Sequence, residues 1–188
     1  MEDYLRDNME NGEQLLWSGG SASEKVMDNT YRIPYLLRFL ISYGLAAALM
    51  IYAVKVTGGL RISVFLVLLV LGSMIPLTAI ADGMKVRSLG YAATSKRLIR
   101  VNGSILYSAD YDDIGECRFG KDPSGNTSLL CGDKAVKSKP SKWRGLALFT
   151  GTHEKDTENH VTDYVFYAID DPEGLKKALN GKVKYTES

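Results

Sequence analysis

Two long apolar segments separated by five residues constrain this chain more than any other feature of its sequence. The first, residues 39–56, has Lys55 as its only charge, and the second, residues 62–81, has none. Crossing about 30 Å of hydrocarbon takes about 20 apolar residues in a helix. The alternative is a pair of core helices in a soluble protein, but both segments are apolar all round and lack an amphipathic stripe. The sequence therefore predicts two transmembrane helices.

The link between the two segments, residues 57–61, predicts an antiparallel hairpin because it is short and contains Gly58 and Gly59. Lys and Arg collect on the cytoplasmic side of membrane proteins, so their distribution predicts the orientation. The link side carries Lys55 and Arg61. The opposite flanks carry more cations, namely Arg32, Arg38, Lys85, Arg87, Lys96, Arg97 and Arg100. We expect a multi-pass protein of the inner or plasma membrane with both termini in the cytoplasm.

Small residues on the first apolar segment predict a helix contact. Gly44 and Ala48 are four residues apart, with Ala47 beside them, which permits close approach of another helix. Gly72 and Ser73 on the second segment are the expected opposite surface. Neither segment carries paired acids, a histidine or an interruption, so the sequence gives no residues for transport chemistry.

Charge and length divide the rest of the chain. The 188 residues have a formal net charge of +1, which gives no basis for nucleic acid as the main partner. The length allows one globular domain besides the apolar segments. We expect an acidic amphipathic N-terminal segment over residues 1–32, the transmembrane hairpin over residues 33–82, and a cytoplasmic domain over residues 83–188.

The N-terminal segment mixes apolar residues with acids over residues 2–17, which is typical of a short amphipathic helix. Trp17 has two possible places, the membrane surface or the C-terminal domain, and we favour docking onto the domain. Ser21 and Glu24 fit a capping box before a second short helix.

Cys117 and Cys131 are the two cysteines of the chain. They do not form a CxxC pair and have no Cys or His neighbours at zinc spacing. Because their domain is expected in the reducing cytoplasm, we expect free thiols, with a structural disulfide as the less favoured alternative.

From about Leu89 the pattern changes to short strands divided by turns. Asn102 and Gly103 stand between two apolar-rich runs and predict a hairpin, because both residues tolerate positive φ. A polar turn over residues 122–126 predicts a second hairpin. Two further strands are expected at residues 144–151 and 163–170.

A helix is expected to close the domain. Asp171 is a good N-cap, Pro172 fits the first helical position and Gly181 follows as a stop. Between them Leu175, Ala178 and Leu179 form one apolar stripe. The predicted fold is membrane-anchored α+β: the two-helix hairpin plus an antiparallel β-barrel or sandwich capped by a C-terminal helix.

Four motifs in this order carry a family resemblance: GEQLLWSG (12–19), YAATSKRLIRVNG (91–103), YDDIGECRF (111–119) and FYAIDDPEGLKKAL (166–179). They are similar to the opening, first hairpin, third strand and closing helix of the bacterial pleckstrin-homology (PH)-like membrane proteins. With the hairpin, the resemblance spans most of the chain and implies a PH-like domain held at a membrane. Residues 133–162 are longer than such a domain needs, which leaves the strand count open.

The basic stretch over residues 133–145 is a candidate binding surface. In one interpretation it is a lipid-facing loop, where each cation attracts anionic headgroups by about 1 kcal/mol and the tryptophan inserts at the interface. In the other, which we favour, the loop is solvated and the tryptophan packs on the domain. The candidate residues are Lys137, Lys139, Lys142, Trp143 and Arg144, with Lys134 beside them.

Lys96, Arg97 and Arg100 form a second candidate group, near the first hairpin of the domain. In eukaryotic PH domains, basic residues there often bind phosphoinositides. Bacteria generally lack those lipids, so the resemblance does not transfer that activity. The equal alternative is that Arg97 and Arg100 are ordinary strand residues near an anionic membrane.

The sequence contains no recognisable catalytic set. His153 and His160 flank an acidic run, but a metal site needs a further ligand in fixed geometry. No GxSxG, P-loop or GxGxxG motif occurs. We therefore expect no enzyme activity, no cofactor, no metal and no small-molecule substrate.

The leading functional hypothesis is a non-enzymatic membrane protein whose cytoplasmic PH-like domain binds a protein or a lipid headgroup, or self-associates. The hairpin would raise the effective concentration of the domain for membrane-bound partners. The alternative is a small accessory subunit that joins a larger membrane complex through its transmembrane helices. A membrane enzyme acting on lipid ranks last.

Overall fold

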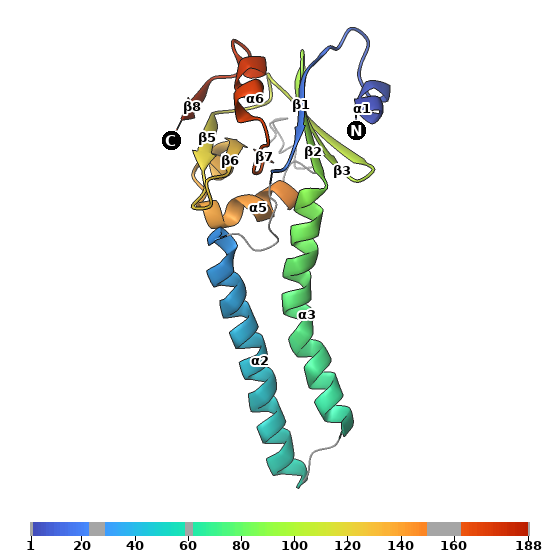
Figure 1. The fold of residues 1–188 in the computed structure, drawn as a ribbon, viewed down its shortest axis with the longest axis vertical. Helices are drawn as coiled ribbons and strands as arrows, with labels where there is room; N and C mark the ends of the chain where they lie inside the picture. Colours follow the sequence, from blue (N-terminus) through green and yellow to red (C-terminus); the bar gives the residue numbers. More distant parts are fainter. Residues whose placement is uncertain (1, 23–28, 59–61, 150–162, 188) are drawn as a thin grey trace. The chain divides into compact units, whose positions relative to one another are not determined.

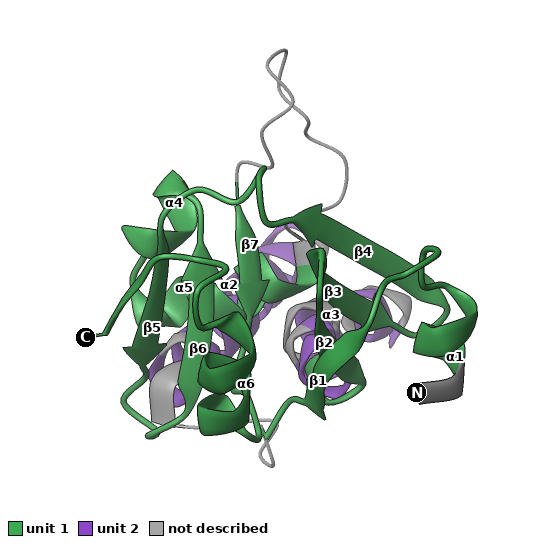
Figure 2. Cartoon of the chain, turned by 90° about the horizontal axis from the view of Figure 1, so that it is seen from above, with its two compact units in different colours: residues 1–24, 85–188 green, residues 25–84 purple. Residues whose placement is uncertain are grey.

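The computed structural model describes residues 2–22, 29–58, 62–149 and 163–187. They belong to two compact units, shown in two colours in Figure 2. Residues 1–24 with residues 85–188 make the first unit, called the polar domain below. Residues 25–84 make the second, called the helical unit. The first 24 residues therefore belong to the polar domain, whereas the sequence predicts a separate segment over residues 1–32.

The helical unit contains α2, Asn29–Thr57, and most of α3, Ile62–Arg87 (Figure 1). In the described part of the chain, one helix is long and apolar enough to span a membrane: α2, over Tyr35–Val56. That judgement rests on length and composition. Only 6% of its apolar window is buried in the structure, whereas a core helix of a soluble protein is mostly buried.

Small and hydroxyl-bearing residues join α2 to α3. The Ser42 hydroxyl donates a 2.6 Å hydrogen bond to the Gly72 carbonyl, and the Tyr43 and Ser73 hydroxyl oxygens lie 3.2 Å apart. A side chain at Gly72 would lie 3.5 Å from Ala46. Gly72 and Ser73 thus contact α2, as expected, but at a different face from the predicted one. Gly44 and Ala48 are exposed, and no heavy atom lies within 4 Å of a Cβ built at Gly44.

One four-stranded antiparallel sheet of the polar domain has the order β1-β2-β3-β4. Its strands are β1 Leu15–Gly20, β2 Leu89–Thr94, β3 Arg97–Asn102 and β4 Ile105–Asp110. The hairpin predicted at Asn102 and Gly103 is confirmed, with Gly103 at φ 63° between β3 and β4. Helix α1, Glu2–Asp7, packs Leu5 onto this sheet beside Ile99.

The second four-stranded sheet has the order β7-β6-β5-β8. Its strands are β5 Cys117–Lys121, β6 Thr127–Cys131, β7 Tyr164–Phe166 and β8 Tyr185–Glu187. The predicted hairpin at residues 122–126 is confirmed, because the Asp122 carboxylate accepts hydrogen bonds from the Ser124 and Asn126 amides. β8 pairs with β5 in parallel, whereas the other strand pairs of the two sheets are antiparallel. The strands form two separate four-stranded sheets and not one closed barrel.

The prediction of a strand over residues 144–151 is wrong for its described residues. They belong to α5, Pro140–Phe149, which follows the one-turn helix α4, Asp133–Val136. Trp143 and Ala147 are both buried, and their four-residue spacing is that of one helix face. Pro140 at the first helical position favours this start. The remaining residues of the predicted strand lie outside the described part of the chain.

Helix α6, Pro172–Leu179, confirms the helix predicted near the C-terminal end of the domain. The Asp171 carboxylate accepts a 3.0 Å hydrogen bond from the Gly174 amide, which confirms the N-cap. Leu175 and Leu179 are fully buried. α6 contacts β1 and β2, and it is seen end-on beside β1 in Figure 2.

Buried tyrosines connect the two sheets. The Tyr91 hydroxyl on β2 donates to the Tyr167 carbonyl at 2.9 Å and accepts from the Tyr167 amide at 3.0 Å. Tyr164 on β7 donates its hydroxyl to the Tyr107 carbonyl on β4 at 2.9 Å. The Tyr91 and Phe166 rings stack at 4.5 Å. These contacts satisfy the polar atoms of large side chains inside the core.

The structure does not have the predicted free thiols, because Cys117 and Cys131 are joined by a disulfide in it. The two residues are register partners in the β5–β6 hairpin, and their Cα atoms lie 4.1 Å apart. They are 14 residues apart in the chain, and the hairpin brings them together.

Candidate functional site

The residues that carry the family resemblance contact one another in the polar domain. Glu13 accepts a hydrogen bond from Arg97 Nε and another from Arg97 Nη2, both at 3.0 Å. The Thr94 hydroxyl donates to the same carboxylate at 2.6 Å. Burial raises the pKa of Glu13, but the bonds from Arg97, Thr94 and the Glu10 amide outweigh it, so the pKa is lowered.

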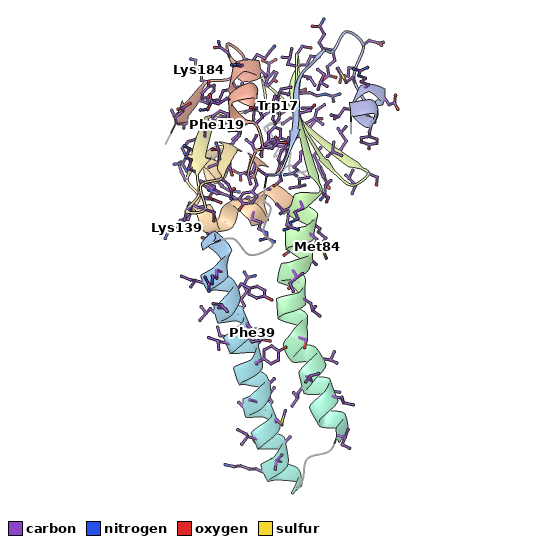
Figure 3. The ribbon with its side chains drawn as sticks, in the orientation of Figure 1. Trp17, Phe39, Met84, Phe119, Lys139 and Lys184 are labelled. Atoms are coloured by element: carbon purple, nitrogen blue, oxygen red, sulfur yellow. A yellow bond between two sulfur atoms is a disulfide. The ribbon has the colours of Figure 1, made fainter. Side chains whose placement is uncertain are left out.

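Trp17 joins the same N-terminal strand to the closing helix. Its indole Nε1 donates to the Asp171 carboxylate at 3.2 Å, and the side chain is buried. Trp17 is labelled in Figure 3. The Gly20 amide donates to Asp170 at 2.8 Å. A Cβ at Gly19 would collide with the Trp17 ring and with Asp170. The preferred place for Trp17, docked on the domain, is confirmed.

The first group of candidate binding residues, Lys96, Arg97 and Arg100, differs in exposure and in contacts. The side chain of Arg97 is 12% exposed and is engaged by Glu13. Lys96 is half exposed and pairs with Glu10 at 3.1 Å. Arg100 is fully buried. The three residues therefore do not form one open basic surface in the structure.

Arg100 lies among aromatic rings inside the domain. Its guanidinium carbon is 4.9 Å from the Tyr107 ring centroid and 5.5 Å from that of Tyr164. Rings at this distance stabilise a cation through their quadrupole. Burial lowers the pKa of Arg100. In this environment its guanidinium packs in the core and is out of reach of a headgroup while the domain stays folded.

The second group of candidate residues separates into an exposed and a buried part. Trp143 is 1% exposed and Arg144 is 6% exposed. The Trp143 ring packs on β5, where a Cβ added at Gly120 would lie 2.6 Å from it, and its Nε1 donates to the Ser138 carbonyl at 3.2 Å. The alternative in which Trp143 inserts into a membrane therefore does not match this conformation.

Four exposed lysines remain, and they follow one another along α4, the connection and the start of α5. We call residues 133–142 the lysine segment; its exposed cations are Lys134, Lys137, Lys139 and Lys142. The one acid among them, Asp133, lies 3.5 Å from Lys137 in an exposed pair. With four lysines against one acid, the segment has a net positive charge, and the exposed pair is worth little in water.

Short backbone anchors hold the lysine segment on the domain. The Ala135 amide donates to the buried Asp163 carboxylate at 2.7 Å, and the Gly132 amide donates to the Glu116 carbonyl at 3.0 Å. With the Trp143 ring on β5, these contacts fix the ends of the segment and leave its cations outside. An array of cations of this kind can bind a polyanionic surface.

The described residues contain no group of three or more His, Cys, Asp or Glu side chains placed to hold a metal. His153 and His160, and the capping box that needs Glu24, fall outside the part of the chain that the structure describes.

Sequence reasoning missed two connections of this domain, the Glu13–Arg97 pair and the Trp17–Asp171 bond. Both join residues far apart in the chain. The available signal was the presence of all four residues in the resembling motifs, which a binding interpretation of Arg97 did not use.

Comparison with known proteins gives no match for this chain among family models, curated proteins or solved structures.

Proposed function

We propose that this protein is a non-enzymatic membrane protein that presents a PH-like domain at the cytoplasmic membrane face. In this proposal α2 and α3 cross the bilayer as a hairpin, and the lysine segment binds anionic lipid headgroups. The observation that carries the binding function is the exposure of four successive lysines while the neighbouring Trp143 and Arg144 are buried.

Exposed apolar side chains support the membrane part of the proposal. Large apolar residues are exposed along both helices, among them Leu36, Leu40, Ile41, Leu45 and Tyr52 on α2 and Leu66, Val70 and Leu77 on α3. Exposed apolar side chains along helices of this length are unfavourable in water and favourable in hydrocarbon. The excess of Lys and Arg outside the link favours cytoplasmic termini.

Electrostatics supports a lipid headgroup as the ligand. Each lysine near an anionic membrane surface contributes about 1 kcal/mol, and the attraction decays within a Debye length of about 8–10 Å. A domain held at the membrane by its own helices can bind headgroups with this weak attraction, because tethering gives it a high effective concentration at the surface.

The proposal can be tested by lysine acetylation of the full-length chain in nanodiscs. We compare discs of phosphatidylcholine alone with discs that also contain phosphatidylglycerol, and we measure each lysine by mass spectrometry. We expect Lys134, Lys137, Lys139 and Lys142 to react about fivefold more slowly in the anionic discs, which corresponds to about 1 kcal/mol for each lysine. High salt should remove the difference.

Lys184 provides the matched control, because it is exposed and lies at the opposite end of the polar domain from Lys139 in Figure 3. Its rate should be the same in both discs. A Lys139→Gln/Lys142→Gln variant should lose protection at Lys134 and Lys137, and Lys184→Gln should not. Equal protection of Lys184 and the lysine segment, or none at all, would contradict the proposal.

A second function, assembly through the helices, is favoured by the exposed face of α2. Gly44 and Ala48 lie on that face, away from the Ser42–Gly72 contact. Small residues there would let a second membrane helix approach closely. Native mass measurement of Gly44→Leu/Ala48→Leu, against Ile41→Leu as control, tests it. A larger complex that persists unchanged in the variant would exclude this face.

A further inference from the structure

The disulfide lies at the point where the lysine segment begins. Cys131 is the last residue of β6, and only Gly132 separates it from α4. Cys117, its partner, begins β5. Both side chains are buried, at 0% and 1% exposure. The bond therefore closes the end of the β5–β6 hairpin from which the four exposed lysines emerge.

The lysine segment has three kinds of anchor, and one of them is covalent. The backbone of Gly132 and Ala135 is held by Glu116 and Asp163. The Trp143 ring rests on β5. The Cys117–Cys131 bond adds a link that survives every fluctuation of the hydrogen bonds around it. Breaking this link removes the one constraint that does not depend on packing.

We propose that Cys117 and Cys131 form a redox modification site that regulates the lysine segment. This inference rests on the proposed function and on its cytoplasmic placement, where protein thiols are kept reduced. In the reduced form the lysine segment is held by non-covalent anchors alone, and in the oxidised form the disulfide fixes it. A fixed array of cations loses less conformational freedom on binding, so the oxidised form binds anionic headgroups more tightly.

The chemistry is thiol–disulfide exchange with a thiol or disulfide of low molecular weight, such as glutathione. In oxidation, the thiolate of one cysteine attacks a glutathione disulfide, forms a mixed disulfide and releases one glutathione. The second cysteine then attacks the mixed bond, forms Cys117–Cys131 and releases the second glutathione. Two electrons pass from the protein thiols to the glutathione disulfide, and two glutathione thiols carry the protons away.

Access to the buried sulfur atoms comes from the edge of the sheet. β8 covers the outer edge of β5 and pairs with it at only three positions, one of which is Cys117 with Tyr185. Thr186 and Glu187 on β8 are exposed. A short exposed edge strand opens at low free-energy cost compared with global unfolding. Its opening gives a small thiol a path to Cys117.

Thiol trapping of the full-length chain in cells tests the redox step. Cells are quenched in acid before and after a pulse of diamide, and free thiols are blocked with N-ethylmaleimide. Disulfides are then reduced, and the thiols that this releases are labelled with maleimide–polyethylene glycol. Because the chain has two cysteines, the disulfide adds two labels. We expect no label before the pulse and two labels after it.

A chain that carries two labels before the pulse has a permanent bond and overturns the switch and the cytoplasmic placement together. A chain that stays unlabelled after the pulse overturns the switch alone.

The regulatory step is tested in anionic nanodiscs by the lysine acetylation rates. We expect the protection of four lysines to fall about threefold when the protein is reduced with dithiothreitol: Lys134, Lys137, Lys139 and Lys142. This is the change expected when binding must immobilise about one more long side chain. The Cys117→Ser/Cys131→Ser variant should match the reduced protein in both conditions. Tryptophan fluorescence of the reduced wild type verifies that the polar domain remains folded. Equal protection in the two redox states overturns the regulation. Absence of protection in both states overturns the proposed function itself, and thiol trapping remains interpretable in either case.

Discussion

Glu13 and Arg97 are 84 residues apart in the chain and form a two-point ion pair, with Nε–Oε1 and Nη2–Oε2 distances of 3.0 Å. The Glu13 carboxylate is buried and the Arg97 side chain is 12% exposed. The pair connects the segment before β1 to β3 across the sheet. Together with the pairing of β1 and β2, it joins the N-terminal residues to a domain whose other strands follow the apolar helices.

Replacement of Glu13 by Gln should lower the free energy of unfolding of the polar domain by about 2 kcal/mol at neutral pH, because the charge-assisted bonds to Arg97 are lost. The two tryptophans, Trp17 and Trp143, are both buried in the polar domain. Their fluorescence in urea, with the full chain in detergent, therefore reports this domain and not the helices. Glu10→Gln is a suitable control because the Glu10 side chain is 57% exposed.

The same pair makes stability depend on pH. The folded-state pKa of Glu13 is lowered from its ordinary value of 4.5, so its contribution is present above pH 4.5 and is lost as the pH falls through the lower folded-state value. The wild type should thus unfold with a higher free energy than Glu13→Gln at neutral pH, and this difference should decrease as the pH is lowered below about 4.5. An advantage that stays constant down to pH 3 would show that the carboxylate charge is not the cause.

The contact between Gly120 and Trp143 predicts a second effect. A Cβ at Gly120 would lie 2.6 Å from the indole ring, so Gly120→Ala should cost about 1–3 kcal/mol through overpacking. Gly115→Ala is the matched control, because no heavy atom lies within 4 Å of its added Cβ. Urea unfolding followed by tryptophan fluorescence measures both. Equal stability of the two variants would mean that α5 does not hold Trp143 against β5.

Asp171 combines two roles, and its variants should separate them. It caps α6 through the Gly174 amide and accepts the Trp17 indole N–H. Asp171→Ala removes both contacts and should cost about 2 kcal/mol, whereas Asp171→Asn keeps a cap and should cost about half as much. The same urea unfolding measurement compares them. The order of the two values is the test: an Asn variant as unstable as the Ala variant would assign the whole effect to the carboxylate charge.

Local signals in the sequence predicted the local elements of the fold. The Asn102–Gly103 turn, the polar turn after β5 and the Asp171 cap each depend on a few neighbouring residues, and each is present. Residues 144–151 read as a strand in the sequence because their short apolar run fits either element. The helix there follows from the four-residue spacing of Trp143 and Ala147 against β5, and packing of that kind is decided by the tertiary structure.

The candidate site was predicted less well, because exposure depends on contacts between distant residues. Arg97 and Arg100 lie in a basic motif, but Glu13 engages the first and tyrosine rings surround the second. The disulfide was the one distant contact within reach of the sequence. Cys117 and Cys131 stand at equal distance from Ser124, the centre of the predicted turn, so a symmetric hairpin register already places them opposite one another.

Reduction of that disulfide should lower the stability of the polar domain by about 3 kcal/mol, the value expected when a loop of about 15 residues is no longer closed in the unfolded chain. The full-length protein is unfolded in urea with and without dithiothreitol, and the tryptophans report the transition. The Cys117→Ser/Cys131→Ser variant should unfold at the same urea concentration in both buffers. If dithiothreitol shifts that variant as much as the wild type, the effect does not come from the disulfide. If it shifts neither, the bond does not constrain the unfolded chain, and the lysine segment gains no added restraint from it.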